Sequence, residues 1–344
     1  MASTIIKLNA NENPLGASPQ VINSLNEITQ QLHRYPTRND RELCKVLAEH
    51  YSNDLTHDYF CVGNSACEMI ELITRVFLDK ESQVIVCPPT FHIYEKMAKN
   101  EKAQVIKVPL EQENFNYNIK NILDAITSKT RLLFICSPNN PTGSVLSVAQ
   151  LDNLLQKIPQ HVMVVADEVY KHYTTDNDLM DTLLRTKLKR NLFVVHSFSK
   201  AYGLAGLRLG YVVAHPSLIQ KIRAFYRTFH LSSLAIVAGI TALKDQQHLR
   251  KSIDLAKEQR TILYRELQNL GVDCWPSKGN FILIKPKNCD EMYEYFQQHN
   301  ILVNPTFKSG LPGGLRISLG LPEHNRIFIH TLKQYLQRSS KCKS

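Results

Sequence analysis

The sequence of 344 residues predicts an α/β fold in which helices cover both faces of a mostly parallel sheet. Two observations lead to this prediction. Short apolar runs alternate along the chain with segments whose apolar residues recur at helical spacing. Most of the apolar runs are continuous rather than alternating, which is typical of central strands buried on both faces. We find no internal repeat and no low-complexity segment.

Five apolar runs are predicted as strands, at residues 83–87, 131–136, 162–166, 192–196 and 210–214. Helices are expected between and after them, at residues 65–77, 147–157 and 216–229. In each of these segments the apolar residues return every three or four positions, and Ser147 is a candidate N-cap.

The character of the sequence changes after about residue 260. A long charged helix is expected over 253–270, followed by a strand at 280–285, a helix near Met292 and a strand at 314–319. We therefore predict three parts: a segment at 1–35 that packs along a domain boundary, a large domain at 36–260, and a small α+β domain at 261–344.

The net charge of +10 is partly carried by the last residues, where Arg338, Lys341 and Lys343 are expected to form a solvated tail. A basic solvent face explains the remaining charge. The alternatives are a preference for anionic ligands or for nucleic acid.

Location is predicted from cysteine usage and hydropathy. The eight cysteines form no C-x-x-C pair, which favours free thiols in a reducing cytoplasm over a zinc site or disulfides. No run of 18 apolar residues exists to form a membrane-spanning helix, and residues 1–7 lack the pattern of a secretory signal.

The carboxyl ends of parallel strands are the expected place for chemistry. The strongest motif there is the segment 197–211, SFSKAYGLAGLRLGY, which follows a predicted strand. Partial burial of Lys200 would lower its pKa and make it a nucleophile for Schiff-base formation. The adjacent hydroxyls and the arginine are donors suited to a phosphate. A surface lysine in a flexible glycine-rich loop is the alternative.

Three further motifs follow strands. Asp167 ends an apolar run and could pair with a protonated pyridine nitrogen, or act as a helix cap or metal ligand. In the turn Ser137–Gly143, Asn140 can direct its amide into the cleft. The turn Gly63–Ala66 opens a helix whose N–H groups can hold an anion, although an ordinary strand-to-helix turn would look the same.

The order and content of these motifs resemble those of the fold-type I pyridoxal-phosphate aminotransferases of class I/II, from Leu8 to Leu319. This resemblance implies a large domain with a mostly parallel seven-stranded sheet covered by helices and a smaller α+β domain. It also implies pyridoxal 5'-phosphate as the cofactor, and an amino acid or a phosphorylated amino alcohol and a keto acid as substrates.

The resemblance assigns roles to individual residues. Lys200 would bond the cofactor aldehyde and move the substrate's α-proton, Asp167 would pair with the ring nitrogen, and Phe91 would stack on the ring. Tyr170 and Asn140 would bond the ring oxygen. The expected phosphate ligands are the backbone at Ser65 and Ala66 and the side chains of Ser197, Ser199 and Arg208. The expected substrate-binding residues are Arg316, which would clamp a carboxylate, together with Asn140 and Tyr35.

Within the family, the segments 8–19 and 34–36 look most like histidinol-phosphate aminotransferases, in which the tyrosine matched by Tyr35 enters the neighbouring subunit's site. A homodimer is therefore expected. Threonine-phosphate decarboxylases and some aromatic aminotransferases share this opening and remain alternatives. A transcription regulator on the same scaffold would need an added DNA-binding domain, for which the sequence before Leu8 leaves no room.

Three departures from the family pattern are visible, of which the first is Ser137, which begins the segment 137–143 where the family usually has Asn. The phosphate turn reads Gly-Asn-Ser-Ala-Cys-Glu at 63–68, where the family usually has Gly-Asn-Gly-Ser-Asp-Glu. Asn304 occupies a position where histidinol-phosphate enzymes commonly carry an arginine, which leaves the exact substrate open.

Overall fold

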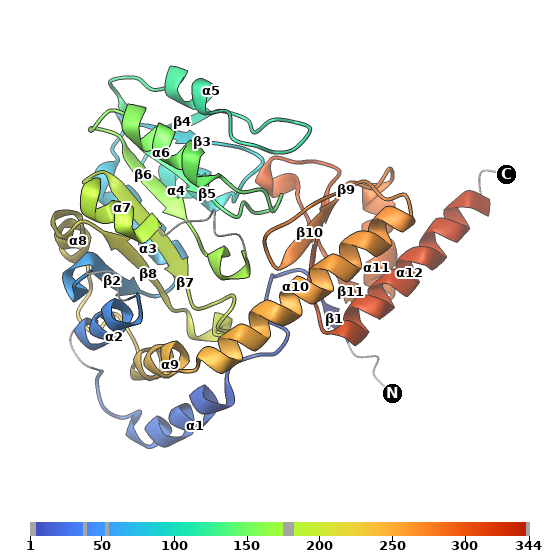
Figure 1. Cartoon of the computed structure of the whole chain (residues 1–344), viewed down its shortest axis with the longest axis horizontal. Helices are drawn as coiled ribbons and strands as arrows, with labels where there is room; N and C mark the ends of the chain where they lie inside the picture. The colour runs from blue at the N-terminus through green and yellow to red at the C-terminus, as the bar shows by residue number, and fades with distance from the viewer. Residues whose placement is uncertain (1–4, 37–39, 52–54, 175–181, 342–344) are drawn as a thin grey trace.

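A computed structural model describes residues 5–36, 40–51, 55–174 and 182–341, apart from the side chains of 184, 188 and 339–341. Lys343 of the expected basic tail lies outside the described residues, as does the side chain of Lys341. The chain forms a large sheet flanked by helices and, beside it, a smaller unit (Figure 1).

The large sheet has seven strands in the order β2-β8-β7-β6-β5-β3-β4. Their bounds are β2 Phe60–Gly63, β3 Gln83–Val86, β4 Gln104–Lys107, β5 Thr130–Cys136, β6 Met163–Asp167, β7 Leu192–Ser197 and β8 Gly210–Ala214. β8 runs antiparallel to both of its neighbours, and the other pairs are parallel. The predicted α/β fold with a seven-stranded, mostly parallel sheet is confirmed, and each of the five predicted strands is present.

Two apolar layers enclose this sheet. Within β5, Leu133 and Ile135 face one layer, whereas Leu132 and Phe134 face the other, as expected for alternating side chains along a strand. Buried helix residues complete both layers, which explains why the strands are continuously apolar. One face is covered by α3 (Ala66–Phe77), α4 (Ile93–Asn100) and α8 (Pro216–Arg223). The other face is covered by α2 (Arg41–Tyr51), α5 (Ile119–Asp124), α6 (Val148–Lys157), α7 (Thr182–Leu188) and α9 (Ser233–Lys244).

One helix is shorter than its sequence pattern indicates. The pattern predicts a helix to residue 229, but α8 ends at Arg223. Phe229 has a φ of 58°, which a right-handed helix does not contain, and Tyr226 donates a hydrogen bond to the Val62 carbonyl at 2.6 Å. The segment therefore turns back toward β2 instead of continuing.

The smaller unit contains an antiparallel sheet in the order β12-β13-β10-β9. Its elements are β9 (Cys274–Trp275), β10 (Phe281–Ile284), α11 (Cys289–Gln298), β11 (Ile301–Leu302), β12 (Asn304–Pro305), β13 (Leu315–Ser318) and α12 (Pro322–Lys341). The 3-10 turns of the chain are η1 (Thr29–Gln31), η2 (His57–Tyr59), η3 (Lys171–Tyr173), η4 (Ala205–Leu207) and η5 (Phe307–Ser309).

The long helix α10 (Gln246–Asn269) joins the two units (Figure 1). It starts seven residues earlier than the predicted helix because the Asp245 side chain caps it, accepting a hydrogen bond from the His248 N–H at 3.1 Å. The predicted domain division after residue 260 falls inside this unbroken helix.

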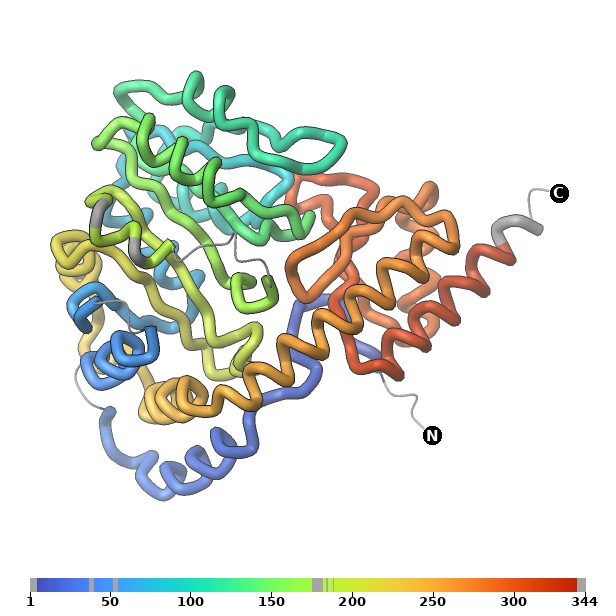
Figure 2. The backbone as a smooth tube through the Cα atoms, in the orientation of Figure 1, coloured from blue at the N-terminus to red at the C-terminus, as the bar shows by residue number. Residues whose placement is uncertain are grey.

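The N-terminal segment contacts both units. β1 (Ile6–Lys7) pairs in parallel with β11, and the chain then passes toward the large sheet, where α1 (Pro19–Ile28) packs against α9 (Figure 2). Between them, the Asn13 amide donates to the Ala201 carbonyl at 2.9 Å and to the Ser252 hydroxyl at 2.8 Å. Across the described residues, no helix is both long enough and apolar enough to span a bilayer.

Candidate active site

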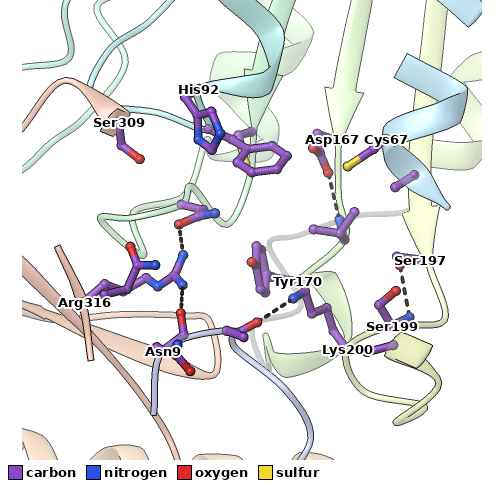
Figure 3. A pocket seen from close by; sticks show the side chains of 18 of the residues that line it. Asn9, Cys67, His92, Asp167, Tyr170, Ser197, Ser199, Lys200, Ser309 and Arg316 are labelled. Atoms are coloured by element: carbon purple, nitrogen blue, oxygen red, sulfur yellow. Dashed lines mark hydrogen bonds between the residues drawn. The ribbon is translucent and has the colours of Figure 1, made fainter. Parts of the chain in front are cut away.

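The carboxyl ends of β5, β6 and β7 meet the start of α3 and the strand β13 around a cavity of about 750 Å³. Every site residue expected from the sequence, except Tyr35, lines this cavity. Figure 3 shows Lys200, Ser197 and Ser199 on one side and Arg316 on the other, with Asp167 and Tyr170 between them.

Asp167 ends β6 and is 2% exposed. Its Oδ2 accepts a hydrogen bond from the Tyr94 hydroxyl at 2.6 Å, and its Oδ1 accepts one from the Val169 N–H at 3.2 Å. Burial raises the pKa of this carboxyl to about 6, despite the opposing effect of the Tyr94 hydrogen bond. Among the described residues, no group of three or more His, Cys, Asp or Glu side chains could hold a metal ion.

Lys200 follows β7, and its Nζ donates to the Ala10 carbonyl at 3.1 Å (Figure 3). Burial lowers the pKa of Lys200 to about 8, and the positive charge of Arg316 acts in the same direction. An appreciable fraction of this amine is therefore neutral near pH 7 to 8, as a nucleophile or a base requires.

Arg316 lies on β13, is 8% exposed, and forms no ion pair with any described carboxylate. Its Nη1 donates to the Asn140 side-chain oxygen at 2.7 Å and its Nη2 to the Asn9 carbonyl at 2.6 Å. The Nε has no partner, and burial lowers the pKa of the guanidinium. A buried cation that lacks a counter-ion is unfavourable, so this arrangement suits an anionic ligand.

Tyr170 connects the cavity to the N-terminal segment. Its hydroxyl accepts a hydrogen bond from the Asn11 amide at 3.0 Å, and burial raises its pKa to about 12. The hydroxyl therefore stays protonated at neutral pH and can donate to an oxygen in the cavity.

The start of α3 forms the anion-binding part of the wall. Ser65 has a φ of 96° and caps the helix, and the Ala66 N–H at the first helical position has no acceptor within the helix. Gly210 of β8 lies directly beneath, because a Cβ added there would lie 2.3 Å from the Ala66 nitrogen. Backbone N–H groups at a helix start attract anions.

Side chains from the loop after β7 complete this wall. The Ser197 hydroxyl accepts a hydrogen bond from the Ser199 N–H at 3.0 Å, which fixes the turn that leads to Lys200. Arg208 adopts a left-handed conformation with a φ of 52°, and its Nη1 donates to the Ala205 carbonyl at 3.0 Å. Ser197, Ser199, Arg208 and the start of α3 therefore all line the cavity, with two hydroxyls and a guanidinium among them.

Phe91 lines the cavity and contacts the Tyr94 ring edge to face, with 5.7 Å between the ring centroids. Val169, which sequence reasoning did not single out, also lines the cavity and packs in the same apolar layer as Phe91. These side chains give the cavity apolar surface suited to a flat aromatic ring.

Tyr35 does not reach the cavity of its own chain. Its side chain is 82% exposed and stacks on Phe229, with 4.7 Å between the ring centroids. The expected role of Tyr35 in substrate binding therefore depends on a second copy of the chain.

Sequence reasoning missed other residues of the cavity wall: Asn9, Glu12, His92, Tyr293 and Lys308. Asn9 and Glu12 belong to the Asn- and Pro-rich opening segment, which was expected at the domain boundary, so a signal was present. Tyr293 and Lys308 come from the smaller unit, and nothing local in the sequence distinguishes them from surface residues.

The residues around the cavity fit pyridoxal phosphate. An amine with a lowered pKa, a buried carboxyl group and an anion cradle at a helix start all line one cavity. A ring aldehyde, a ring nitrogen and a phosphate are the groups that such a donor set would bind.

Comparisons with known proteins agree with this geometry. The family described as aminotransferase class I and II matches residues 3–332. A histidinol-phosphate aminotransferase of Anoxybacillus flavithermus is 37% identical over 343 residues, covering 99% of this chain and 91% of that protein. The histidinol-phosphate aminotransferase of Sinorhizobium meliloti, solved in complex with pyridoxal-5'-phosphate, has a TM-score of 0.88 at 21% identity, covering 97% of this chain and 91% of that one. The L-threonine-O-3-phosphate decarboxylase of Porphyromonas gingivalis has a TM-score of 0.85 at 25% identity, covering 97% and 100%. The chain belongs to the class I and II aminotransferase family.

Proposed function

We propose that this chain is a pyridoxal-phosphate enzyme that transfers the amino group of histidinol phosphate to 2-oxoglutarate, giving imidazole acetol phosphate and glutamate in histidine biosynthesis. The observation that carries this proposal is the placement of Lys200 and of Arg316, a buried cation without a counter-ion, in one cavity. The full-length relative named for this activity supports the choice of substrate.

Specific residues of the cavity would hold the cofactor. Asp167 would accept a hydrogen bond from the ring nitrogen, while Asn140 and Tyr170 would bond the ring oxygen and Phe91 would cover a ring face. The phosphate would lie against the backbone of Ser65 and Ala66 and the side chains of Ser197, Ser199 and Arg208. When bound, pyridoxal phosphate supplies an aldehyde that takes up the amino group and a ring that accepts the electron pair left by the α-proton.

Lys200 would move the α-proton. Its side chain is half-buried and its pKa is about 8, so it can exist as a neutral amine that accepts a proton and afterwards returns it to a different carbon. The hydrogen bond from the Lys200 amine to the Ala10 carbonyl directs the amine toward the cavity wall formed by the opening segment.

Arg316 would bind the anionic group attached to the substrate's α-carbon. In glutamate this group is a carboxylate, whereas in histidinol phosphate the same carbon carries a phosphorylated CH2–O arm. The contacts of Arg316 with Asn140 and Asn9 orient its guanidinium while leaving Nε without a protein partner.

A related reaction is the second candidate, since Asn304 provides no positive charge beside Arg316. Decarboxylation of threonine phosphate or transamination of an aromatic amino acid would use the same cofactor and the same Lys200. Histidinol phosphate has no carboxylate on its α-carbon and so cannot be decarboxylated. Release of carbon dioxide therefore distinguishes the decarboxylation of threonine phosphate from amino transfer by histidinol phosphate.

A homodimer with shared active sites is part of this proposal. Tyr35 is exposed and lies outside the cavity of its own chain, as a residue that serves a partner's site would be. A cytoplasmic location is also proposed, because the cysteines of the described residues are free thiols.

A substrate panel tests the proposed function. The purified holoenzyme is incubated with 2-oxoglutarate and with histidinol phosphate, threonine phosphate or phenylalanine, and glutamate and carbon dioxide are measured. We expect glutamate with histidinol phosphate as the preferred donor. Release of carbon dioxide from threonine phosphate, or reaction with phenylalanine alone, would replace the proposed substrate.

A further inference from the structure

Glutamate and histidinol phosphate differ in the charge of the group that would face Arg316. An inference about how the site selects between them rests on the proposed function. A carboxylate carries one negative charge, whereas a phosphate monoester carries about 1.5 to 2 near pH 7. A site that prefers histidinol phosphate over amino acids therefore benefits from a second cation beside Arg316.

The cross-strand neighbours of Arg316 in the sheet do not supply this cation. Its direct partners are Leu283 of β10, which is apolar, and Asn304 of β12, whose side chain is a neutral amide. Arg316 itself already donates to Asn140 and to Asn9. One guanidinium, partly engaged by protein oxygens, remains on this side of the cavity.

The other basic side chains of the wall narrow the choice. Among the described residues that line the cavity, the lysines and arginines are Lys200, Arg208, Lys308 and Arg316. Lys200 and Arg208 lie on the side proposed for the cofactor. Lys308 is therefore the remaining strong cation of the lining.

Lys308 lies on η5, four residues after Asn304, and its side chain is exposed. Its Nζ lies 5.9 Å from the centroid of the exposed Phe307 ring, and it forms no ion pair with any described carboxylate. Its positive charge lowers the pKa of His92, a second residue of the cavity wall, in addition to the effect of burial. Ser309, the next residue, lies on the Arg316 side of the cavity, away from Lys200 (Figure 3). The Lys308 ammonium can thus approach an anion held by Arg316 without breaking a salt bridge.

We propose that Lys308 is a specificity-determining residue that binds the second negative charge of the substrate phosphate, in the position where Asn304 offers none. Recognition then comes from two elements of the smaller unit, because β13 provides Arg316 and η5 provides Lys308. Phosphorylated amino compounds would be favoured over amino acids of the same shape.

A charge series of ligands tests this proposal in the holoenzyme. The three ligands share the imidazole side chain and differ in the group on the α-carbon that would face Arg316. This group is uncharged in histidinol, carries one negative charge in histidine and carries about two in histidinol phosphate. Binding is followed by the change in cofactor absorbance, so that a ligand need not turn over. In Lys308→Met we expect histidinol phosphate to bind about tenfold more weakly, with little change for histidine and none for histidinol.

Lys96→Met is the matched control. Lys96 lines an adjoining cavity of about 570 Å³, which Lys308 also lines, but it does not line the cavity that contains Lys200. This control removes the same charge from the same surface. We expect it to leave all three dissociation constants close to those of the wild type.

The pH dependence gives a readout that a purely structural role of Lys308 would not alter. The phosphate gains its second charge as pH rises through about 6, so wild-type affinity for histidinol phosphate should increase between roughly pH 5.5 and 7, and this increase should be smaller in Lys308→Met. The other charged or titratable groups near Lys308 line one of its two cavities: Glu12, His92, Tyr293 and Arg316 line the Lys200 cavity, and Glu95, Lys96, Lys99 and Lys107 line the adjoining one. Loss of a proton from His92 over this range would weaken anion binding and so has the opposite sign.

The outcomes distinguish the role of Lys308 from the proposed function. If the wild type does not bind or use histidinol phosphate, the proposed function is wrong. If it does, and Lys308→Met binds histidinol phosphate as the wild type does, the role of Lys308 is wrong. An equal loss for histidine and histidinol phosphate would also overturn it, because the effect would then not depend on the second charge.

Discussion

At the scale of single residues, burial moves two pKa values of the site toward neutrality from opposite sides. Lys200 loses affinity for its proton and Asp167 gains it, because both charged forms are removed from water. The pKa values of the two groups therefore differ by only about 2, although their ordinary values are 10.5 and 3.8. Perturbed values of this kind are typical of functional sites.

The raised pKa of Asp167 predicts a pH-dependent stability for the cofactor-free protein. The folded protein holds this proton up to about pH 6, whereas the unfolded chain releases it near 3.8. The folded state thus binds more protons between these values, and the contribution of Asp167 to the free energy of unfolding decreases as pH rises through this window. The full decrease is about 3 kcal/mol.

Asp167→Asn removes this titration while keeping an oxygen for the Tyr94 hydroxyl. Thermal unfolding of the cofactor-free wild type and variant is measured between pH 4 and 7. We expect the wild type to lose stability relative to the variant as pH rises from 4 to 6, and the two to run parallel above that. Parallel curves over the whole range would contradict a raised pKa at Asp167.

At the scale of elements, the contact between β8 and the start of α3 shapes the anion cradle. Gly210 approaches the Ala66 nitrogen so closely that an added Cβ would lie 2.3 Å from it, and the obstructing atoms are backbone atoms that cannot rotate away. Gly210→Ala should therefore shift the first turn of α3, destabilise the protein by about 1 to 3 kcal/mol and reduce retention of the cofactor.

Gly206→Ala is the control for this prediction, since Gly206 lies four residues earlier, in η4, and nothing lies within 4 Å of a Cβ added there. Thermal unfolding and cofactor content after dialysis are measured for both variants. A Gly210→Ala protein that keeps its cofactor as well as Gly206→Ala does would show that this contact does not shape the cradle.

The elements also show what the sequence can predict. Strands β3, β5, β6, β7 and β8 were predicted because burial on both faces makes them continuously apolar. β4 was missed because it lies at the sheet edge, where Gln104 and Lys107 are exposed and flank only two apolar residues. The predicted end of α8 was also wrong, because tertiary contacts of Tyr226 override the helical pattern of the sequence.

At the scale of the whole molecule, the site depends on contacts between residues that are far apart in the sequence. Asn11 bonds the hydroxyls of both Ser318 and Tyr170 through its backbone and side-chain nitrogens. Strand-end motifs could be placed at one sheet edge by topology alone. The contributions of the opening segment and of η5 could not, because they depend on how the smaller unit packs.

The proposed homodimer predicts complementation between two defective chains. If Tyr35 serves the partner's cavity, Tyr35→Ala lowers activity and Lys200→Ala abolishes it. A mixed dimer of these two chains contains one cavity that has Lys200 from one chain and Tyr35 from the other. The isolated mixed dimer should then show about half of wild-type activity, the fraction of its sites that are complete.

Mixing Lys200→Ala with Arg316→Ala provides the control. Both residues line the cavity of a single chain, so every site in such a mixed dimer lacks one of them and no activity should return. Amino transfer is measured after the variants are co-expressed with different affinity tags and the mixed species is isolated. Recovery in the first pair alone means that Tyr35 acts across the interface. If neither pair recovers activity, Tyr35 does not act across the interface. The exposed Tyr35, stacked on Phe229, would then make no contribution to the partner's site.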